Sequence, residues 1–91
     1  MVALSAKLTF HIPHAFSLKD KRQVSRSLIE KTRRRFNASV AEVDTQEMHQ
    51  TLTIGVAVVS GEFFHARRSM EEIIRFMEEQ ADAELVDVSE G

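Results

Sequence analysis

Apolar and polar residues alternate from residue 2 to residue 12. The apolar side of this segment holds Val2, Leu4, Ala6, Leu8, Phe10 and Ile12. A period of two is typical of a β-strand with one face on a hydrophobic core. The other side holds Ala3, Ser5, Lys7, Thr9 and His11, which indicates a solvated or lightly covered face. Pro13 cannot donate to a sheet ladder, so we expect the strand to stop there.

The period becomes helical after Ser17, which forms a variant of the capping box with Asp20. We therefore predict a helix from about Leu18 to Phe36, ended by Asn37, a residue that tolerates the left-handed conformation. Its core-facing side spans an arc of roughly 140°. This arc holds Val24, Leu28, Ile29, Thr32 and Phe36.

Residues 39–43 and 51–60 are rich in β-branched side chains and predict two strands joined by a hairpin loop at 44–50. The apolar side of the longer strand holds Leu52, Ile54, Val56 and Val58. The shorter strand is ambiguous, because Val40 and Val43 cannot both face the core without a bulge.

A second helix is predicted from about Phe63 to Ala81, and a short final strand over residues 84–89. The core side of the helix holds Phe63, Ala66, Met70, Ile73, Ile74 and Met77. Its polar side has charges at i,i+4 spacing, which predict three ion pairs. They are Glu71 with Arg75, Arg68 with Glu72, and Arg75 with Glu79.

The order β-α-β-β-α-β within 91 residues predicts an α+β fold of the ferredoxin-like kind. The sheet would have four antiparallel strands, with both helices on one face and the first and third strands central. A chain of this length has room for one domain, residues 1–91. The uncovered sheet face and the edge strands are then the places where a ligand, RNA or a second copy is expected to bind.

Composition excludes several classes of protein. The chain has no cysteine, which excludes disulfides, thiolate catalysis and thiolate metal sites. No segment approaches the roughly 20 apolar residues of a membrane span, and the alternating start differs from a signal peptide, so we expect a cytoplasmic protein that does not bind membranes.

Charge is strongly segregated, although the net charge is only -2. Residues 19–35 carry a net charge of +6 and residues 71–91 carry -7. Four cations of the first helix fall within about 60° on the helical wheel, on the side turned from the core. They are Lys19, Arg22, Arg26 and Arg33, with Arg34 beside them in the last turn.

Such a helix can contact the phosphates of RNA, because each neutralised phosphate releases counterions. The alternative is an ordinary solvated face whose cations favour the helix dipole. Aromatic side chains of the kind that stack on bases are missing from the predicted open face, and the chain has no Trp or Tyr. Any RNA binding should therefore depend on backbone contacts.

Other chemistry finds little support in the sequence. His11 and His14 lack a third metal ligand at a recognisable spacing, with His49 and His65 elsewhere in the chain, so we expect neither a metal nor a cofactor. No glycine-rich phosphate loop or nucleophile motif is present, and we expect no enzyme activity and no catalytic residue.

Three stretches carry a resemblance to a known family. They are SLKDKRQV from Ser17, RRRFNASVAEVD from Arg33, and IGVAVVS from Ile54. In this order and spacing they resemble the YlxP-like family of small bacterial proteins of unknown function, over residues 2 to about 80. The resemblance implies a ferredoxin-like domain, often encoded near translation and ribosome-maturation genes, without an established activity. Ala38 and Met48 depart from the family pattern, and the second departure weakens any argument for an aromatic stacking site in the hairpin loop.

The sequence thus predicts a binding domain without enzyme activity, with RNA or the ribosome as the expected partner of the basic helix. The alternative is a homo-oligomeric or small-ligand interaction module. In that alternative, a homodimer would form through the strand at 39–43 or through the open sheet face.

Overall fold

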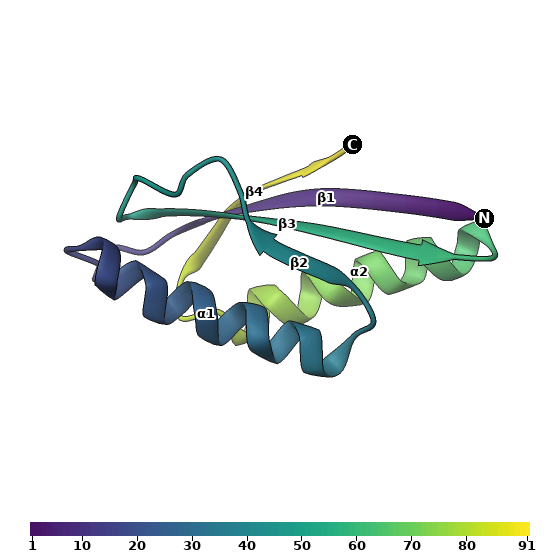
Figure 1. The fold of residues 1–91 in the computed structure, drawn as a ribbon, viewed down its shortest axis with the longest axis horizontal. Coiled ribbons are helices and arrows are strands. Elements are labelled where there is room, and N and C mark those ends of the chain that lie inside the picture. Colours follow the sequence, from purple (N-terminus) through teal and green to yellow (C-terminus); the bar gives the residue numbers. More distant parts are fainter.

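The structure, a computed structural model, describes residues 1–91 and has the element order β-α-β-β-α-β. Its elements are β1 (Val2–His11), α1 (Leu18–Arg35), β2 (Ser39–Glu42), β3 (Thr51–Ser60), α2 (Phe63–Gln80) and β4 (Glu84–Glu90). The strands form one antiparallel sheet in the order β2-β3-β1-β4. Both helices lie on the same face of this sheet (Figure 1). The predicted ferredoxin-like arrangement, with β1 and β3 central, is confirmed.

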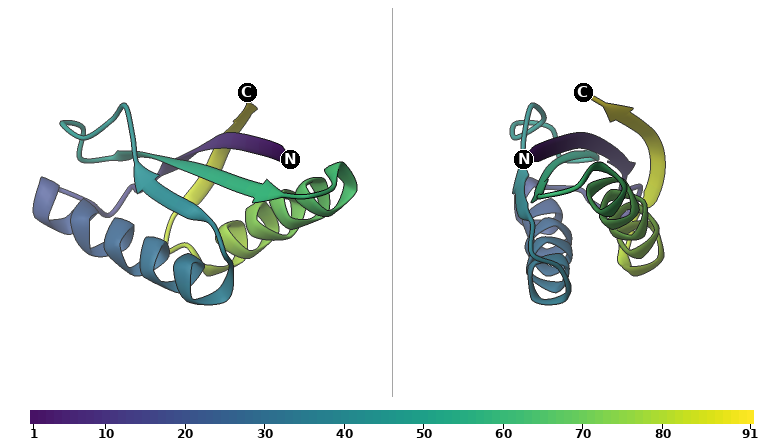
Figure 2. Two further views of the ribbon diagram at one scale, coloured as in Figure 1. Left: turned by 45° about the vertical axis from the view of Figure 1, so that its right-hand side comes forward. Right: turned by 90° about the vertical axis from the view of Figure 1, so that its right-hand side faces the viewer.

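The two faces of the sheet differ in what covers them. Figure 2 shows both helices below one face, whereas the β2–β3 loop and the end of β4 rise on the other side. We call this second side the open face. It is only partly covered, and its concave shape results from the two raised segments.

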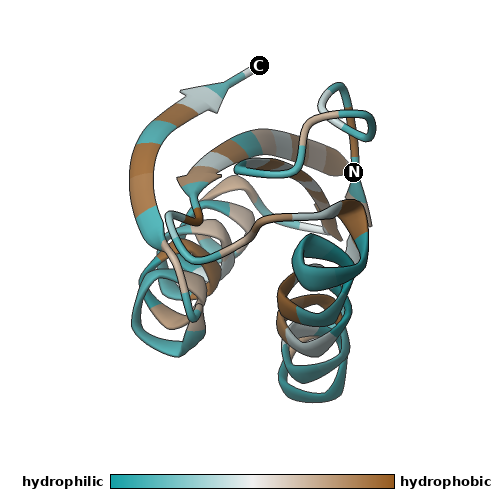
Figure 3. Cartoon of the chain, turned by 90° about the vertical axis from the view of Figure 1, so that its left-hand side faces the viewer, coloured by the Kyte–Doolittle hydropathy of each residue, from teal (hydrophilic) through white to brown (hydrophobic).

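The core lies between the sheet and the helices and follows the predicted alternation. The buried apolar strand residues are Ala6, Leu8, Phe10, Val40, Leu52, Ile54, Val56 and Val58, and the buried apolar helix residues are Leu28, Ala66, Met70, Ile73 and Met77. Figure 3 shows the corresponding bands of hydrophobic residues, with hydrophilic residues on the outer turns of the helices. Neither helix is long and apolar enough to cross a membrane.

No bulge is needed at β2, because Val40 in the strand and Val43 just after it lie on opposite faces. Val40 is buried on the helix side, and Val43 lines a hollow on the open face. The ladder continues past the strand end, where the Val43 N–H donates to the Thr53 carbonyl at 2.9 Å. Glu42 shares the helix side with Val40 because side chains alternate along a strand. The irregularity lies instead between β1 and β4, where the register shifts at Thr9/Phe10.

Helix α1 begins as predicted but ends differently. Ser17 Oγ accepts a hydrogen bond from the Asp20 N–H at 3.1 Å, and the Asp20 carboxylate accepts from the Phe16 N–H at 3.0 Å. The helix ends at Arg35, because Phe36 is extended (φ -128°) and packs edge-on against the Phe76 ring at 5.4 Å.

The predicted left-handed stop at Asn37 is wrong. The chain leaves α1 in an extended conformation and enters β2 directly, so no left-handed residue is required. Asp44 is the residue with positive φ, at 63°, and it begins the β2–β3 loop. Asn and Asp tolerate this region better than most residues because their short polar side chains bond locally.

The three ion pairs predicted along α2 are absent. Glu71, predicted to pair with Arg75, instead pairs with Arg67 one turn earlier in the helix, at 3.3 Å. Both side chains are more than half exposed. Because exposed pairs of this kind stabilise a protein by only about 0 to 1 kcal/mol, the fold does not depend on which pair forms.

Lys21 is the unexpected member of the core. Its side chain is only 1% exposed, although the sequence places it in the basic segment. The ammonium donates to three main-chain carbonyls, those of Thr45 at 2.5 Å, Gln46 at 3.3 Å and Thr51 at 3.3 Å. An ammonium has three protons, so this set satisfies it fully. Lys21 therefore ties the first turns of α1 to both ends of the β2–β3 loop.

Glu42 balances this buried charge from the neighbouring strand. Its Oε2 lies 2.8 Å from Lys21 Nζ, and the side chain is 17% exposed. At this distance the carboxylate neutralises the ammonium directly, while the three carbonyls surround it.

The first prediction concerns the core. Leu28→Ala and Ile54→Ala should each lower the free energy of unfolding by about 2 to 5 kcal/mol, because truncation of a buried side chain leaves a cavity. Urea denaturation measures this. Val59→Ala is the control, since Val59 is 64% exposed and its truncation should change little. An unchanged midpoint for Leu28→Ala would show that α1 packs in another register.

The second prediction concerns the buried ammonium. Lys21→Met should lower the free energy of unfolding by about 3 to 5 kcal/mol, because the Glu42 carboxylate is left without its cation. Lys19→Met removes the same charge from an exposed position two residues away and should have a small effect. Adding Glu42→Gln to Lys21→Met should recover part of the loss. Equal losses for the two single variants in urea denaturation would contradict this.

Candidate functional site

The predicted cations lie on the solvent side of α1, and all five are exposed. They are Lys19, Arg22, Arg26, Arg33 and Arg34. We call the first four the basic stripe. It follows the side of α1 that borders β2, where three of its arginines line a hollow shared with Ala41 and Glu42. Arg34 lies on the next row of the helix, beside Arg26 and Lys31.

No side chain of the basic stripe forms an ion pair. The cationic members of the ion pairs in the structure are Lys7, His14, Lys21, His65 and Arg67. Helix α1 itself contains only two acids, of which Asp20 caps the N-terminus. The other acid, Glu30, lines the same hollow as Arg22, Arg26 and Arg33 without an ion pair to them, so this face keeps an excess of positive charge that can act on an external anion.

Arg33 differs from the other members because it also has a structural contact. Its guanidinium donates to the Val40 carbonyl at 2.6 Å. Val40 is in β2, an edge strand, and an edge carbonyl that faces away from the sheet needs a partner from outside the ladder. The contact holds Arg33 against the sheet edge and occupies one of the few free backbone groups of β2.

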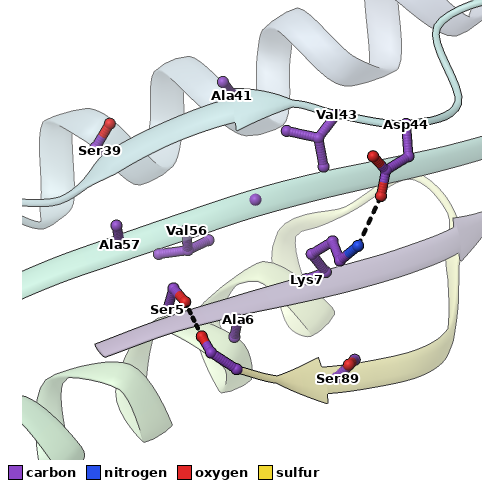
Figure 4. A pocket seen from close by; sticks show the side chains of 12 residues that line it. Ser5, Ala6, Lys7, Ser39, Ala41, Val43, Asp44, Val56, Ala57 and Ser89 are labelled. Atoms are coloured by element: carbon purple, nitrogen blue, oxygen red, sulfur yellow. Dashed lines mark hydrogen bonds and ion pairs between the residues drawn. The ribbon is translucent and has the colours of Figure 1, made fainter. Parts of the chain in front are cut away.

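A second candidate site is a hollow of about 500 Å³ on the open face, which we call the open-face hollow. Residues of all four strands contribute to it, and those labelled in Figure 4 include Ser5, Lys7, Ser39, Ala41, Val43, Asp44, Ala57 and Ser89. Its floor consists of small side chains. Gly55 belongs to this floor, and a Cβ built there would lie 3.3 Å from Val43, so the close approach of the loop favours glycine.

The rim of the open-face hollow carries an ion pair. Lys7 Nζ donates to Asp44 Oδ2 at 2.8 Å, which connects β1 to the β2–β3 loop. The hydrogen bond to Asp44, together with its negative charge, raises the pKa of Lys7 above its usual value. At the other end of the hollow, the Ser5 hydroxyl and carbonyl contact the backbone of Gly91.

The histidines considered as metal ligands are not brought together. His14 contacts Asp82 at 3.3 Å, and His65 contacts Glu62 at 3.6 Å. No group of three or more His, Cys, Asp or Glu side chains has the spacing of a metal site. His14 thus contacts the segment between α2 and β4, and His65 contacts the N-cap residue of its own helix.

Sequence reasoning missed the part that Lys21 and Glu42 play beside the basic stripe. One signal was available, because Lys21 precedes Leu28 by seven residues and so lies on the apolar arc of the helix. A lysine at such a position means either that its ammonium is buried with hydrogen-bond partners or that the core-facing side of the helix has been assigned incorrectly. The partner carboxylate on a distant strand could not be identified from spacing alone.

Comparisons with known proteins agree with the resemblance seen in the sequence. The chain is 28% identical, over 64 residues, to the uncharacterized protein YlxP of Bacillus subtilis (strain 168), and the match covers 70% of each chain. Among solved structures, it is similar to a de novo designed protein with ferredoxin fold, determined by NMR in solution, with a TM-score of 0.60. That match covers 100% of this chain and 84% of the designed one at 14% identity, so it supports the fold alone. The family model described as "Protein of unknown function (DUF503)" matches residues 4–90, and the chain therefore belongs to the DUF503 family.

Proposed function

We propose that this protein is a binding domain without enzyme activity that holds RNA through the basic stripe of α1. The observation that carries the proposal is the absence of any ion-pair partner for Lys19, Arg22, Arg26 and Arg33 on a rigid, exposed helix. Phosphate contacts in nucleic-acid complexes come mainly from Arg and Lys side chains. The basic stripe presents four of them along one helix face.

The length of the stripe fits a run of phosphates. With a rise of about 1.5 Å per residue, Lys19 and Arg33 are about 21 Å apart along the helix axis. Each phosphate neutralised by such a cation releases condensed counterions, and this release favours binding at moderate salt. A polyanionic strand lying along α1 would thus meet several cations at once.

The open face does not suit base stacking. Near its centre Ser5, Lys7 and Ala57 are exposed and Gly55 is half-buried. Stacking on central strands needs aromatic rings, as in the RNA-recognition motif. The proposed RNA contact is therefore made by α1 and not by the sheet. The link of the resembled family to translation genes points to ribosomal RNA as the polyanion.

The third prediction tests this function through its salt dependence. Changing Lys19, Arg22 and Arg26 to Gln should flatten the slope of log affinity against log salt for single-stranded RNA by about 2, because each lost phosphate contact contributes about 0.7. Fluorescence anisotropy with a labelled oligonucleotide measures the slope. Arg33 is left in place because it also bonds the Val40 carbonyl.

The control changes Arg67, Arg68 and Arg75 of α2 to Gln. It alters the net charge by the same amount but leaves the basic stripe intact, so the salt slope should stay near that of the unmodified protein. Equal slopes for both triple variants would mean that only net charge matters. No binding by the unmodified protein at about 50 to 100 mM salt would show that the stripe is merely solvated.

The open-face hollow supports a second candidate function, a homo-oligomeric or small-ligand module. Its volume of about 500 Å³ lies within the range of small-molecule sites, about 300 to 1,000 Å³. Of the two routes to a homodimer, the open face is favoured over β2. That edge strand is only four residues long, and its Val40 carbonyl already accepts from Arg33.

The fourth prediction follows from this second candidate. If two copies join through their open faces, sedimentation velocity should detect a dimer, and Ala57→Arg should convert it to monomer by filling the floor of the open-face hollow. Ser27→Arg on the exposed side of α1 should leave the dimer intact. If the unmodified protein is a monomer at every concentration, the homodimer is excluded, and a small ligand remains the expected occupant of the open-face hollow.

A further inference from the structure

The loop between β1 and α1 presents an aromatic residue to solvent. Phe16 is 78% exposed, although a phenylalanine is among the side chains whose burial stabilises a fold most. The basic stripe begins three residues later, at Lys19. An extended chain spans at most about 3.6 Å per residue, so the Cα atoms of Phe16 and Lys19 are no more than about 11 Å apart. An exposed aromatic ring therefore lies next to the first cation of the stripe.

The backbone on both sides of Phe16 is held in place. Ala15 is fully buried, and its N–H donates to the Ile12 carbonyl at 3.1 Å. The Phe16 N–H donates to the Asp20 carboxylate at 3.0 Å, and the next residue, Ser17, caps α1. The exposed ring is thus carried by an ordered segment. A group presented in this way has less conformational freedom to lose when it binds a ligand.

The β2–β3 loop strengthens the same end of the molecule. Gln50 Nε2 donates to the Pro13 carbonyl at 3.3 Å, and the Gln50 carbonyl accepts from the Ile12 N–H at 3.0 Å. Lys21 connects this loop to the first turns of α1. Figures 1 and 2 show both loops beside the start of α1. The β2–β3 loop carries Met48, which is 52% exposed, so this end of the molecule has a second exposed apolar residue.

These features match the usual design of a surface for single-stranded nucleic acid. Such surfaces combine cations that follow the backbone with aromatic rings on which bases stack. Three phenylalanines of the chain are exposed, and the other two, Phe63 and Phe64, begin α2 at the opposite end of the molecule (Figure 1). Phe16 is the exposed aromatic residue that is continuous with the basic stripe.

We infer that Phe16 stacks on one unpaired base of the bound RNA, while Lys19 and Arg22 contact the phosphates next to that base. This inference rests on the proposed function and adds that the RNA is single-stranded at the start of α1, because a base within a duplex is not free to stack on a side chain. Every base has a π-face, so the contact tolerates any sequence. The surface would then distinguish single strands from duplexes without reading sequence.

The experiment compares Phe16→Ala with unmodified protein by fluorescence anisotropy on a labelled oligouridine. Affinity should fall about 5- to 150-fold, the usual loss when an aromatic residue that stacks on a base is replaced by alanine. The slope of log affinity against log salt should stay unchanged, because no phosphate contact is removed. The control is Phe64→Ala, which removes a ring of similar exposure, 73%, far from the basic stripe and should bind like the unmodified protein.

Two further probes separate stacking from a general effect on the loop. An oligonucleotide of the same length that lacks bases should bind equally to Phe16→Ala and to unmodified protein. The chain has no Trp, so Phe16→Trp supplies a fluorescence signal from this position alone. Saturation with oligouridine should quench that fluorescence, whereas Phe64→Trp should keep its emission.

The outcomes distinguish this inference from the proposed function. If folded Phe16→Ala binds oligouridine as tightly as the unmodified protein does, or if Phe64→Ala loses as much affinity, the stacking contact is overturned and the phosphate contact stands. If the unmodified protein binds no oligonucleotide, both are overturned. If circular dichroism shows that Phe16→Ala does not fold, the fluorescence of Phe16→Trp decides, and an unquenched signal at saturation overturns the stacking contact.

Discussion

The buried ammonium of Lys21 is the constraint on which the arrangement of this molecule depends. One positive charge satisfies carbonyls at both ends of the β2–β3 loop and balances Glu42 on the adjacent strand. Burying an ammonium is costly unless it is paired and fully bonded, so the loop, α1 and β2 must reach these positions together. A displacement of any one of them would leave a charge or a carbonyl without its partner.

This polar anchor explains why α1 and α2 differ so much. The buried residues of α2 are Ala66, Met70, Ile73 and Met77, an ordinary apolar face. Those of α1 are Lys21, Ser25, Leu28 and Thr32, of which only one is apolar. Hydrophobic burial does not specify direction, whereas hydrogen bonds and ion pairs do. The helix that carries the basic stripe is therefore held at a defined rotation, and its outward cations keep a fixed direction.

The sequence predicted the parts of the fold that depend on local pattern. Alternation in β1 and β3, the Ser17 cap and the apolar face of α2 were sufficient to obtain the order of elements and the core, except that Phe63, predicted to face the core, is 46% exposed. The exposure of Lys19, Arg22 and Arg26 also followed from the helical period. Contacts between distant segments could not be read in this way, because nothing in the spacing connects Lys21 to Thr45 or Arg33 to Val40. For the same reason the hollow that three arginines of α1 share with Ala41 and Glu42 appears only once α1 and β2 are placed side by side.

The distribution of charge shows why the net value of -2 is a poor guide to the partner of this protein. Strand order places β2 and β4 at opposite edges of the sheet. The basic stripe borders the β2 edge, whereas β4 carries three exposed acids, Glu84, Asp87 and Glu90. At physiological ionic strength the screening length is about 8 Å, so a ligand near α1 experiences mainly the cations close to it. The acids at the far edge repel the same ligand locally and so favour one direction of approach. A protein with a small net negative charge can in this way present a surface suited to a polyanion, with the orientation set by the sheet.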